Sequence, residues 1–155
     1  MKLLCDQMLG TLAKWLRILG FDTFYANDTM ADDELLRIAK KEQRVIISRD
    51  KELIARGRKK NLTTIWIKTT NLDEQLYQIL KIISIDEKIV LSRCTICNTV
   101  LETRTKSSAE GKVPKKVFEN NDTFWICNKC NKFYWKGSHY DKIVSKIKDI
   151  RQNIR

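Results

Sequence analysis

The sequence has no apolar run close to the roughly 18 residues that a transmembrane helix needs, so no membrane span is expected. An acidic residue, Asp6, interrupts the first apolar stretch after only three residues, which is too early for the apolar region of a secretory signal peptide. Internal repeats and low-complexity tracts are also missing. We therefore expect a soluble, cytoplasmic protein with no membrane partner.

Histidine and proline are scarce, with one residue of each in the chain. A single histidine without a paired carboxylate is weak evidence for acid–base catalysis. This residue, His139, lies in the Lys-Gly-Ser-His stretch of residues 136–139, directly before the last predicted helix. We treat it as a candidate contact for a nucleic-acid phosphate.

Basic residues are abundant. The 155 residues include 30 basic and 19 acidic ones, for a net charge of +11, and 43% are hydrophobic, enough for a packed core. The part before Cys94 has a net charge of +4, and the shorter part from Cys94 onward has a net charge of +7. Such a basic surface favours a polyanionic partner such as RNA or DNA, although solubility alone would also explain it.

Residues 1 to about 68 alternate strand and helix patterns, which is typical of an α/β fold with a parallel sheet. Helical spacing of leucines fills the gaps between the apolar runs, and Asn71 is placed to cap a further helix. The predicted strands cover residues 2–5, 21–25, 45–47 and 63–67.

The character of the sequence changes near residue 90. The cysteine pairs, a polar and basic middle section and the only proline all follow this point. Isoleucines then recur at spacings of four, three and four residues, which predicts an amphipathic helix. We expect two domains, an α/β domain over residues 1–90 and a small metal-binding ribbon with a C-terminal helix over residues 91–155.

Four of the five cysteines form two Cys-x-x-Cys pairs, and this arrangement presents four sulfurs to one tetrahedral metal ion. Two disulfides are the alternative, but no secretory signal supports an oxidising compartment. The spacing also suits a rubredoxin-like iron site, whereas the lysine-rich surroundings favour structural zinc. The predicted zinc ligands are Cys94, Cys97, Cys127 and Cys130. The fifth, Cys5, lies inside the first predicted strand, where we expect a small buried side chain.

Acidic residues follow or precede the predicted strands at corresponding places. Asp6 follows the first strand, Asp32 and Asp33 start the second helix, and Asp50 follows the third strand. Each of them is also suited to cap a helix, and capping needs no convergence in space. If they converge at the carboxyl edge of the sheet, they would repel one another unless Mg²⁺ or Mn²⁺ joined them. Such ions support in-line attack of water on a phosphodiester.

Three stretches together resemble a known family. "CDQMLGTLAKWLRILGFDT", "DDELLRIAKKEQRVIISRD" and "CTICN…CNKCNKFYWKGSHY" occur in the order seen in the mut-seven C-terminal RNase domain family. The resemblance spans nearly the whole chain. It implies a PIN-like nuclease fold, with a parallel sheet flanked by helices, followed by a small zinc-ribbon domain.

The resemblance also implies a metal-dependent ribonuclease that acts on single-stranded or structured RNA. Its catalytic metal ligands carry over to Asp6 and Asp50, while the middle ligand is Asp33 or Asp32. Glu52 is a candidate for a fourth carboxylate that acts through water. Ser48 stands where the family often has threonine, and the hydroxyl is retained.

Candidate contacts for RNA complete this interpretation, and no small-molecule cofactor is expected. The basic residues nearest to the proposed site are Lys14, Arg17 and Arg49, and His139 joins them from the ribbon. The main alternative is a non-catalytic RNA-binding module, associated with ribosomes or tRNA, whose acids only cap helices. A redox carrier built on the four cysteines is a further alternative.

Overall fold

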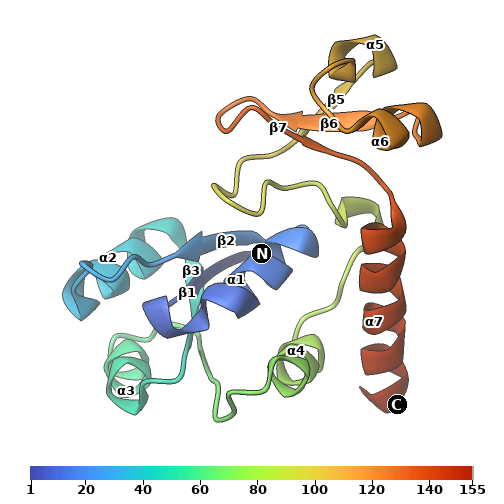
Figure 1. The fold of residues 1–155 in the computed structure, drawn as a ribbon. Coiled ribbons are helices and arrows are strands. Elements are labelled where there is room, and N and C mark those ends of the chain that lie inside the picture. Colours follow the sequence, from blue (N-terminus) through green and yellow to red (C-terminus); the bar gives the residue numbers. More distant parts are fainter. Residues whose placement is uncertain (155) are drawn as a thin grey trace. The chain divides into compact units, whose positions relative to one another are not determined.

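The computed structural model describes residues 1–154 and divides the chain into two compact units (Figure 1). The first unit covers Met1–Asn98 and the second begins at Thr99. Within the described residues, none of the helices combines the length and the apolar character that crossing a bilayer requires.

The first unit is built on a four-stranded parallel sheet with the order β2-β1-β3-β4. In the register, Leu4 of β1 lies opposite Phe24 of β2 and Ile46 of β3. The strands agree with the sequence prediction to within a residue or two, because β-branched and leucine runs mark them clearly. Their bounds are β1 Lys2–Cys5, β2 Asp22–Tyr25, β3 Arg44–Ser48 and β4 Thr64–Trp66.

Helices alternate with these strands, as the sequence predicted for an α/β fold. The α-helices are α1 Gly10–Ile18, α2 Asp32–Glu42, α3 Lys51–Lys59 and α4 Leu72–Leu80, and the short 3₁₀ helices are η1 Gln7–Leu9 and η2 Glu87–Ile89. The side chain of Asn71 accepts hydrogen bonds from the N–H groups of Asp73 and Glu74, so it caps α4 as expected.

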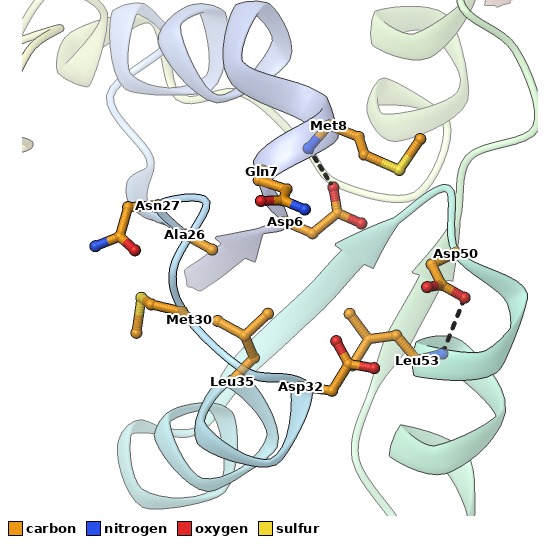
Figure 2. Close-up of a pocket in the computed structure, with 10 residues that line it drawn as sticks. All are labelled: Asp6, Gln7, Met8, Ala26, Asn27, Met30, Asp32, Leu35, Asp50 and Leu53. Atoms are coloured by element: carbon orange, nitrogen blue, oxygen red, sulfur yellow. Dashed lines mark hydrogen bonds between the residues drawn. The ribbon is translucent and has the colours of Figure 1, made fainter.

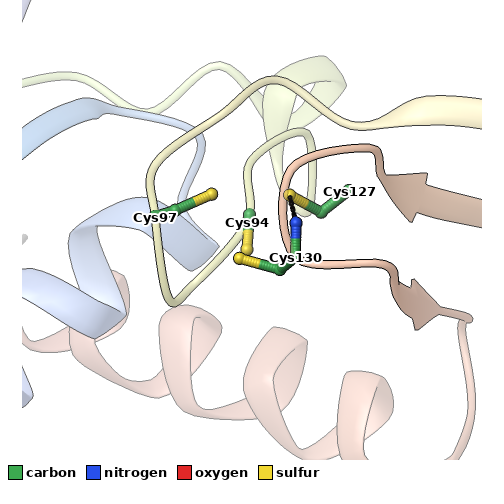
Figure 3. A group of neighbouring side chains, drawn as sticks. All are labelled: Cys94, Cys97, Cys127 and Cys130. Carbon is green, nitrogen blue, oxygen red and sulfur yellow. Dashed lines mark hydrogen bonds between the residues drawn. The ribbon is translucent and has the colours of Figure 1, made fainter.

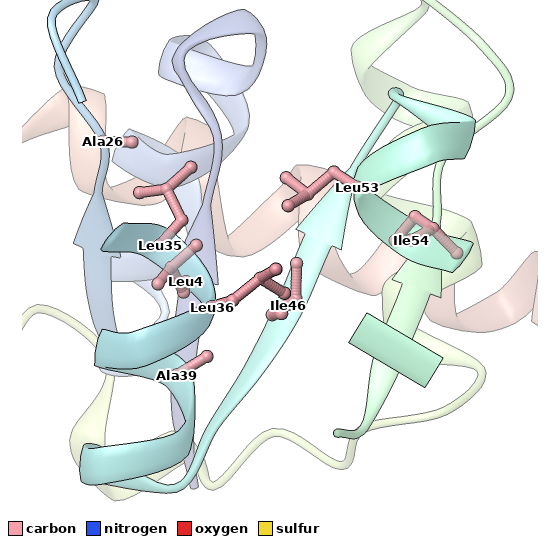
Figure 4. Close-up of a cluster of buried hydrophobic side chains, with 8 residues drawn as sticks. All are labelled: Leu4, Ala26, Leu35, Leu36, Ala39, Ile46, Leu53 and Ile54. Carbon is pink, nitrogen blue, oxygen red and sulfur yellow. The ribbon is translucent and has the colours of Figure 1, made fainter. Parts of the chain in front are cut away.

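One face of the sheet is packed by α2 and α3 (Figure 4). Two leucines and one alanine of α2 meet the central strands there, and two residues of α3 and Ala26 after β2 complete the cluster. Because successive strand residues point to opposite faces, Leu3 and Ile47 point to the other face. The buried cluster of Figure 4 consists of Leu4, Ala26, Leu35, Leu36, Ala39, Ile46, Leu53 and Ile54.

Gly20 lies two residues after the last residue of α1 and has φ +90°. The N–H of Phe21 donates to the carbonyl of Leu16, the bond that defines a Schellman C-cap. A Cβ on Gly20 would lie 2.2 Å from the carbonyl oxygen of Ile89, so glycine is required on both grounds. The segment around Ile89 therefore packs closely on the end of α1.

The second unit contains a three-stranded antiparallel sheet with the order β5-β6-β7. Phe124 is its largest fully buried side chain. The amphipathic pattern at the C-terminus forms α7 Ser138–Ile154, and it buries Ile143, Ile147 and Ile150 as the spacing predicted. The other elements are β5 Glu102–Arg104, α5 Lys106–Ala109, α6 Lys115–Asn120, β6 Phe124–Cys127 and β7 Lys132–Tyr134.

Candidate functional site

The strand order reverses between β1 and β3, and this position is the topological switch point of the sheet. From β1 the chain continues to β2 on one side, and it later returns to β3 on the other side. In open parallel sheets, ligands bind outside the carboxyl ends of the strands at this point. Asp6 directly follows β1 and Asp50 lies two residues after β3, so both reach this edge.

A pocket of about 60 Å³ lies at this edge, and Asp6, Asp32 and Asp50 line it from three separate segments (Figure 2). A hollow of this volume has room for a few water molecules. The wall between the acids is part polar and part apolar. The remaining lining residues are Gln7, Met8, Ala26, Asn27, Met30, Leu35 and Leu53.

Asp6 is the most deeply placed of these carboxylates, with 5% of its surface exposed. Oδ1 accepts a hydrogen bond of 2.9 Å from the N–H of Met8, and Oδ2 accepts one from the hydroxyl of Ser48. Burial raises the pKa of Asp6, and the nearby Asp50 carboxylate adds to this, while the hydrogen bonds oppose it. None of the ion pairs found within residues 1–154 includes Asp6.

Ser48 connects the two aspartates of the switch point. Its hydroxyl donates to Asp6, and its oxygen accepts the backbone N–H of Asp50 at 2.8 Å. Because an ionised carboxylate only accepts hydrogen bonds, the hydroxyl proton of Ser48 points to Asp6, while its oxygen accepts from Asp50. The side chain of Asp50 then caps α3 through Oδ1, at 2.7 Å from the N–H of Glu52 and 3.3 Å from that of Leu53.

Asp32 and Asp33 differ in their positions. Asp32 lines the pocket, whereas Asp33 is not among the lining residues and its side chain is 84% exposed. Arg56 of α3 pairs with both, at 3.2 Å from Oδ2 of Asp32 and in a close contact with Asp33. The geometry therefore brings Asp32, rather than Asp33, toward Asp6 and Asp50. Glu52 is exposed and does not line the pocket.

The four predicted zinc ligands, Cys94, Cys97, Cys127 and Cys130, come together with all sulfur atoms within 4.8 Å of one another (Figure 3). Two are buried and two are partly exposed. Within residues 1–154 this is the one group of three or more potential metal-ligating side chains whose ligand atoms lie so close together. The carboxylates of the acidic pocket, taken as a group, lie farther from one another than these sulfur atoms do. Four thiolates suit a tetrahedral ion such as zinc and leave no open coordination position.

The two cysteine pairs share a local design, because an asparagine follows each of them. Asn98 and Asn131 have φ of 69° and 53°, a conformation that asparagine tolerates better than most residues. Their N–H groups donate back to the carbonyls of Cys94 and Cys127, at 3.0 and 2.7 Å. Each pair is thus a closed turn that holds two sulfurs on one side.

The first turn is tied to the sheet of its own unit. Nη1 of Arg17 donates to the carbonyls of Thr95 and Ile96, and Nε donates to Thr23 at 3.0 Å. Oδ1 of Asn98 accepts the N–H of Thr23 at 3.0 Å. Arg17 is only 8% exposed, and its guanidinium donates hydrogen bonds to these three carbonyls. The sequence had predicted an RNA contact for this side chain.

The other predicted RNA contacts lie at different depths. Lys14 on α1 and His139 on α7 are exposed. Arg49 lies between Ser48 and Asp50 and is half-buried, and its Nε is the one buried side-chain polar atom within residues 1–154 that has no hydrogen-bond partner.

Sequence reasoning missed several residues at this edge. Gln7, Met8 and Asn27 line the acidic pocket, and Arg56 reaches Asp32 from the next helix. Gln7 and Met8 directly follow Asp6, and Asn27 follows the end of β2 by two residues. The position of Gln7, Met8 and Asn27 after the carboxyl ends of strands could have suggested them. No spacing pattern in the sequence predicts that Arg56 pairs with Asp32.

An acidic pocket at the switch point of a parallel sheet, together with a four-cysteine cluster compatible with a zinc ribbon, confirms the fold class expected from the sequence. Among family models, the Mut7-C RNAse domain matches residues 1–147 of the 155. The chain therefore belongs to the Mut7-C RNAse domain family, as the resemblance predicted, and the family points to a nuclease with an RNA-related function. Comparison with curated proteins found no match, and neither did comparison with solved structures.

Proposed function

We propose that this protein is a ribonuclease that hydrolyses RNA phosphodiesters with the help of Mg²⁺ or Mn²⁺ held by Asp6, Asp32 and Asp50. The observation that carries the proposal is their convergence, from three separate segments, on one pocket at the switch point of the sheet. Helix capping alone would not require this convergence.

The residues of the pocket fit a hard divalent cation. Carboxylate oxygens are the preferred ligands of Mg²⁺ and Mn²⁺. A buried carboxylate such as Asp6, whose ionisation is disfavoured and which has no basic partner within residues 1–154, gains from a bound cation. A bound divalent ion would supply Lewis-acid activation of water and would offset the charge that develops on the phosphate.

The chain's own residues have distinct tasks in this proposal. Ser48 fixes the orientation of the Asp6 carboxylate and the backbone of Asp50 at the same time. Arg56 holds Asp32 at the mouth of the pocket. Asp50 keeps Oδ1 on the N–H groups of α3. Within residues 1–154 its Oδ2 accepts no hydrogen bond, so this oxygen is the one that can bind the cation.

Basic side chains on the β4 side of the pocket support RNA as the substrate. Lys51 directly follows Asp50, and its Nζ lies 5.1 Å from the ring centroid of Trp66. Nζ of Lys68 lies 4.7 Å from the same centroid. Together these two lysines give a positive flank that can hold phosphates next to the scissile bond.

The test compares the wild-type chain with Asp6→Asn and Asp50→Asn on end-labelled single-stranded RNA, with and without Mn²⁺. We expect Mn²⁺-dependent cleavage that falls at least a hundredfold in each variant. Mn²⁺ should also raise the unfolding temperature of the wild-type chain and not that of Asp6→Asn, which reports binding without activity. Cleavage that persists unchanged in both variants would contradict the proposal.

A second function, RNA binding without catalysis, is favoured by one observation. Asp50 already caps a helix and Asp32 already pairs with Arg56, so both acids have structural partners. RNA binding that survives in the two variants, with no cleavage by the wild-type chain under any divalent metal, would support this function instead.

A further inference from the structure

A second, larger hollow lies beside the acidic pocket. It has a volume of about 530 Å³, is wide open, and is lined by Gln7, Met8, Tyr25, Asn27 and Asp28. It shares Gln7, Met8 and Asn27 with the acidic pocket, so the two hollows adjoin. A polymer with one phosphate at Asp6 would place its neighbouring nucleotide within reach of this second hollow.

Two large apolar side chains are exposed in this hollow, Met8 from the 3₁₀ helix η1 and Tyr25 from the edge strand β2. Met8 is 57% exposed and Tyr25 is 37% exposed. Tyr25 ends the edge strand β2, and its aromatic face is a surface on which a nucleobase of any sequence can stack. The thioether of Met8 makes favourable contacts with aromatic rings, including those of bases.

The ring of Tyr25 is held in place before any ligand arrives. Its hydroxyl donates to the carbonyl of Gln7 at 2.8 Å. A Cβ on Gly10 would lie 2.9 Å from the same hydroxyl, so the absence of a side chain at the start of α1 makes room for the ring. The hydrogen bond and the close approach keep the ring ordered, which lowers the entropy cost of stacking.

We infer that this hollow is a subsite for one unpaired base of the RNA, adjacent to the phosphate held at the acidic pocket. The amide side chains of Gln7 and Asn27 stand in the same hollow and offer donors and acceptors to the edges of the base. Stacking needs an exposed base face, so the subsite selects single-stranded or looped RNA over duplex. The inference rests on the proposed function.

The order of the strands gives the path of the RNA across the edge of the sheet, from β2 past β1 toward β4. Tyr25 lies at the β2 end, Asp6 follows the neighbouring β1, and the basic flank with Lys51 and Lys68 lies toward β4. A strand that crosses the edge therefore has a base anchored on one side of the scissile phosphate and phosphates anchored on the other side.

The experiment measures binding rather than cleavage, in the full-length Asp50→Asn chain, so that RNA stays intact. The probes are a short single-stranded RNA, the same RNA with one abasic position moved along it, and the matching duplex. We compare Tyr25→Leu with Tyr77→Leu, which makes the same change on α4, where Tyr77 lines neither hollow. Met8→Ala is a second variant, and it removes an exposed side chain that the fold does not need.

We expect Tyr25→Leu to weaken binding of the single strand about tenfold, with the salt dependence unchanged, because stacking and not charge is lost. Met8→Ala should weaken it less, and Tyr77→Leu should have no effect. Tyr25→Phe keeps the stacking face but loses the hydroxyl bond to Gln7, so it should bind more tightly than Tyr25→Leu and less tightly than the parent. One abasic position should reduce binding by the same factor in the parent and have no further effect in Tyr25→Leu. Duplex binding should not depend on Tyr25.

Equal binding by Tyr25→Leu and Tyr77→Leu, or an abasic scan without a sensitive position, would overturn the subsite. In either case, metal-dependent cleavage by the wild-type chain would leave the proposed ribonuclease function standing. Conversely, a Tyr25-dependent base contact in a chain that never cleaves RNA would retain the subsite and remove the proposed function.

Discussion

At the scale of single residues, the site depends on side chains that serve two purposes. Asp50 caps α3 and also lines the acidic pocket. Ser48 supports the Asp6 carboxylate and the backbone of Asp50 with one hydroxyl. Because each group is shared, a substitution at this edge changes both folding and chemistry unless it is chosen to keep one of them.

Substitutions of Asp50 can separate these two purposes. Asparagine is as good an N-cap as aspartate, but it lacks the charge that a cation needs. We expect Asp50→Asn to unfold at the wild-type denaturant midpoint and to lose the Mn²⁺-dependent activity. Asp50→Ala should lose the activity and in addition about 1 kcal/mol of the free energy of unfolding. Equal midpoints for the alanine and asparagine variants would show that the cap contributes nothing measurable.

Asp22 gives a pH prediction. Burial raises the pKa of Asp22, but hydrogen bonds from Arg44 and Asn98 outweigh it, and the pKa is lowered below its usual value of 3.8. A carboxyl with a lowered folded-state pKa stabilises the fold above pH 3.8, and this contribution is lost as the pH falls through the folded-state pKa. Asp22→Asn should therefore lower the free energy of unfolding at pH 7 by about 1–2 kcal/mol.

The difference between Asp22→Asn and the wild type should shrink as the pH falls below about 4, which urea titrations at several pH values measure. A difference that stays constant from pH 7 to pH 3 would contradict this assignment. Asp28, an exposed aspartate of the following loop, gives the control Asp28→Asn.

At the scale of elements, helix α1 connects the acidic edge to the first cysteine turn within one unit. It begins four residues after Asp6, and near its end Arg17 donates to the carbonyls of Thr95 and Ile96. Burial lowers the pKa of the Arg17 guanidinium, and the nearby Cys5 opposes this shift. The guanidinium is therefore a packed structural group.

Replacement of Arg17 tests this role. Arg17→Met keeps the apolar stem but leaves three carbonyls without their donor, so we expect a loss of about 2–4 kcal/mol in the free energy of unfolding. Lys14→Ala, on the exposed side of the same helix, should leave stability unchanged and reduce the salt dependence of RNA binding. Urea denaturation and binding titrations measure the two effects. A stable Arg17→Met chain with weakened RNA binding would reverse the assignment.

At the scale of the whole molecule, the two units differ in what stabilises them. The first has a parallel sheet with buried residues on both faces, whereas the second has one small sheet and helices with few fully buried side chains. Four thiolates that gather within 4.8 Å would repel one another without a metal ion. Zinc binding at such a site contributes about 10 kcal/mol or more to folding.

Metal analysis of the purified chain should therefore find one zinc ion. Cys127→Ser should lose it, and hydrogen exchange should then show lost protection in β5, β6 and β7. Cys5→Ala is the control, because Cys5 is buried in β1, where burial raises the pKa of its thiol, and it is no part of the cluster. Iron in place of zinc would favour the redox alternative.

The sequence by itself determined the strands and helices of the α/β part, the C-terminal helix and the four clustered cysteines, whereas β5, α5, α6, β6 and β7 were not predicted. Runs such as Val45-Ile46-Ile47 predict a strand because alternation and β-branching are local properties, and two Cys-x-x-Cys pairs predict a metal site because each turn is local. The parallel direction of the strands followed from the general rules for α/β folds, whereas the strand order and the meeting of Asp6 and Asp50 at one pocket came from the structure. The domain limits predicted from composition remain a prediction.

Only the tertiary structure decided which neighbouring side chains share that edge. Asp32 and Asp33 are adjacent in sequence, yet the rotation of about 100° per helical residue turns one toward the pocket and leaves the other exposed. Arg17 was a candidate RNA contact by its charge and position, and its burial against Thr95 and Ile96 depends on contacts nearly 80 positions apart. The hollow at Tyr25 likewise requires β2 and the start of α1 to lie side by side. Contacts of this range depend on how the elements pack, and no local pattern records that packing.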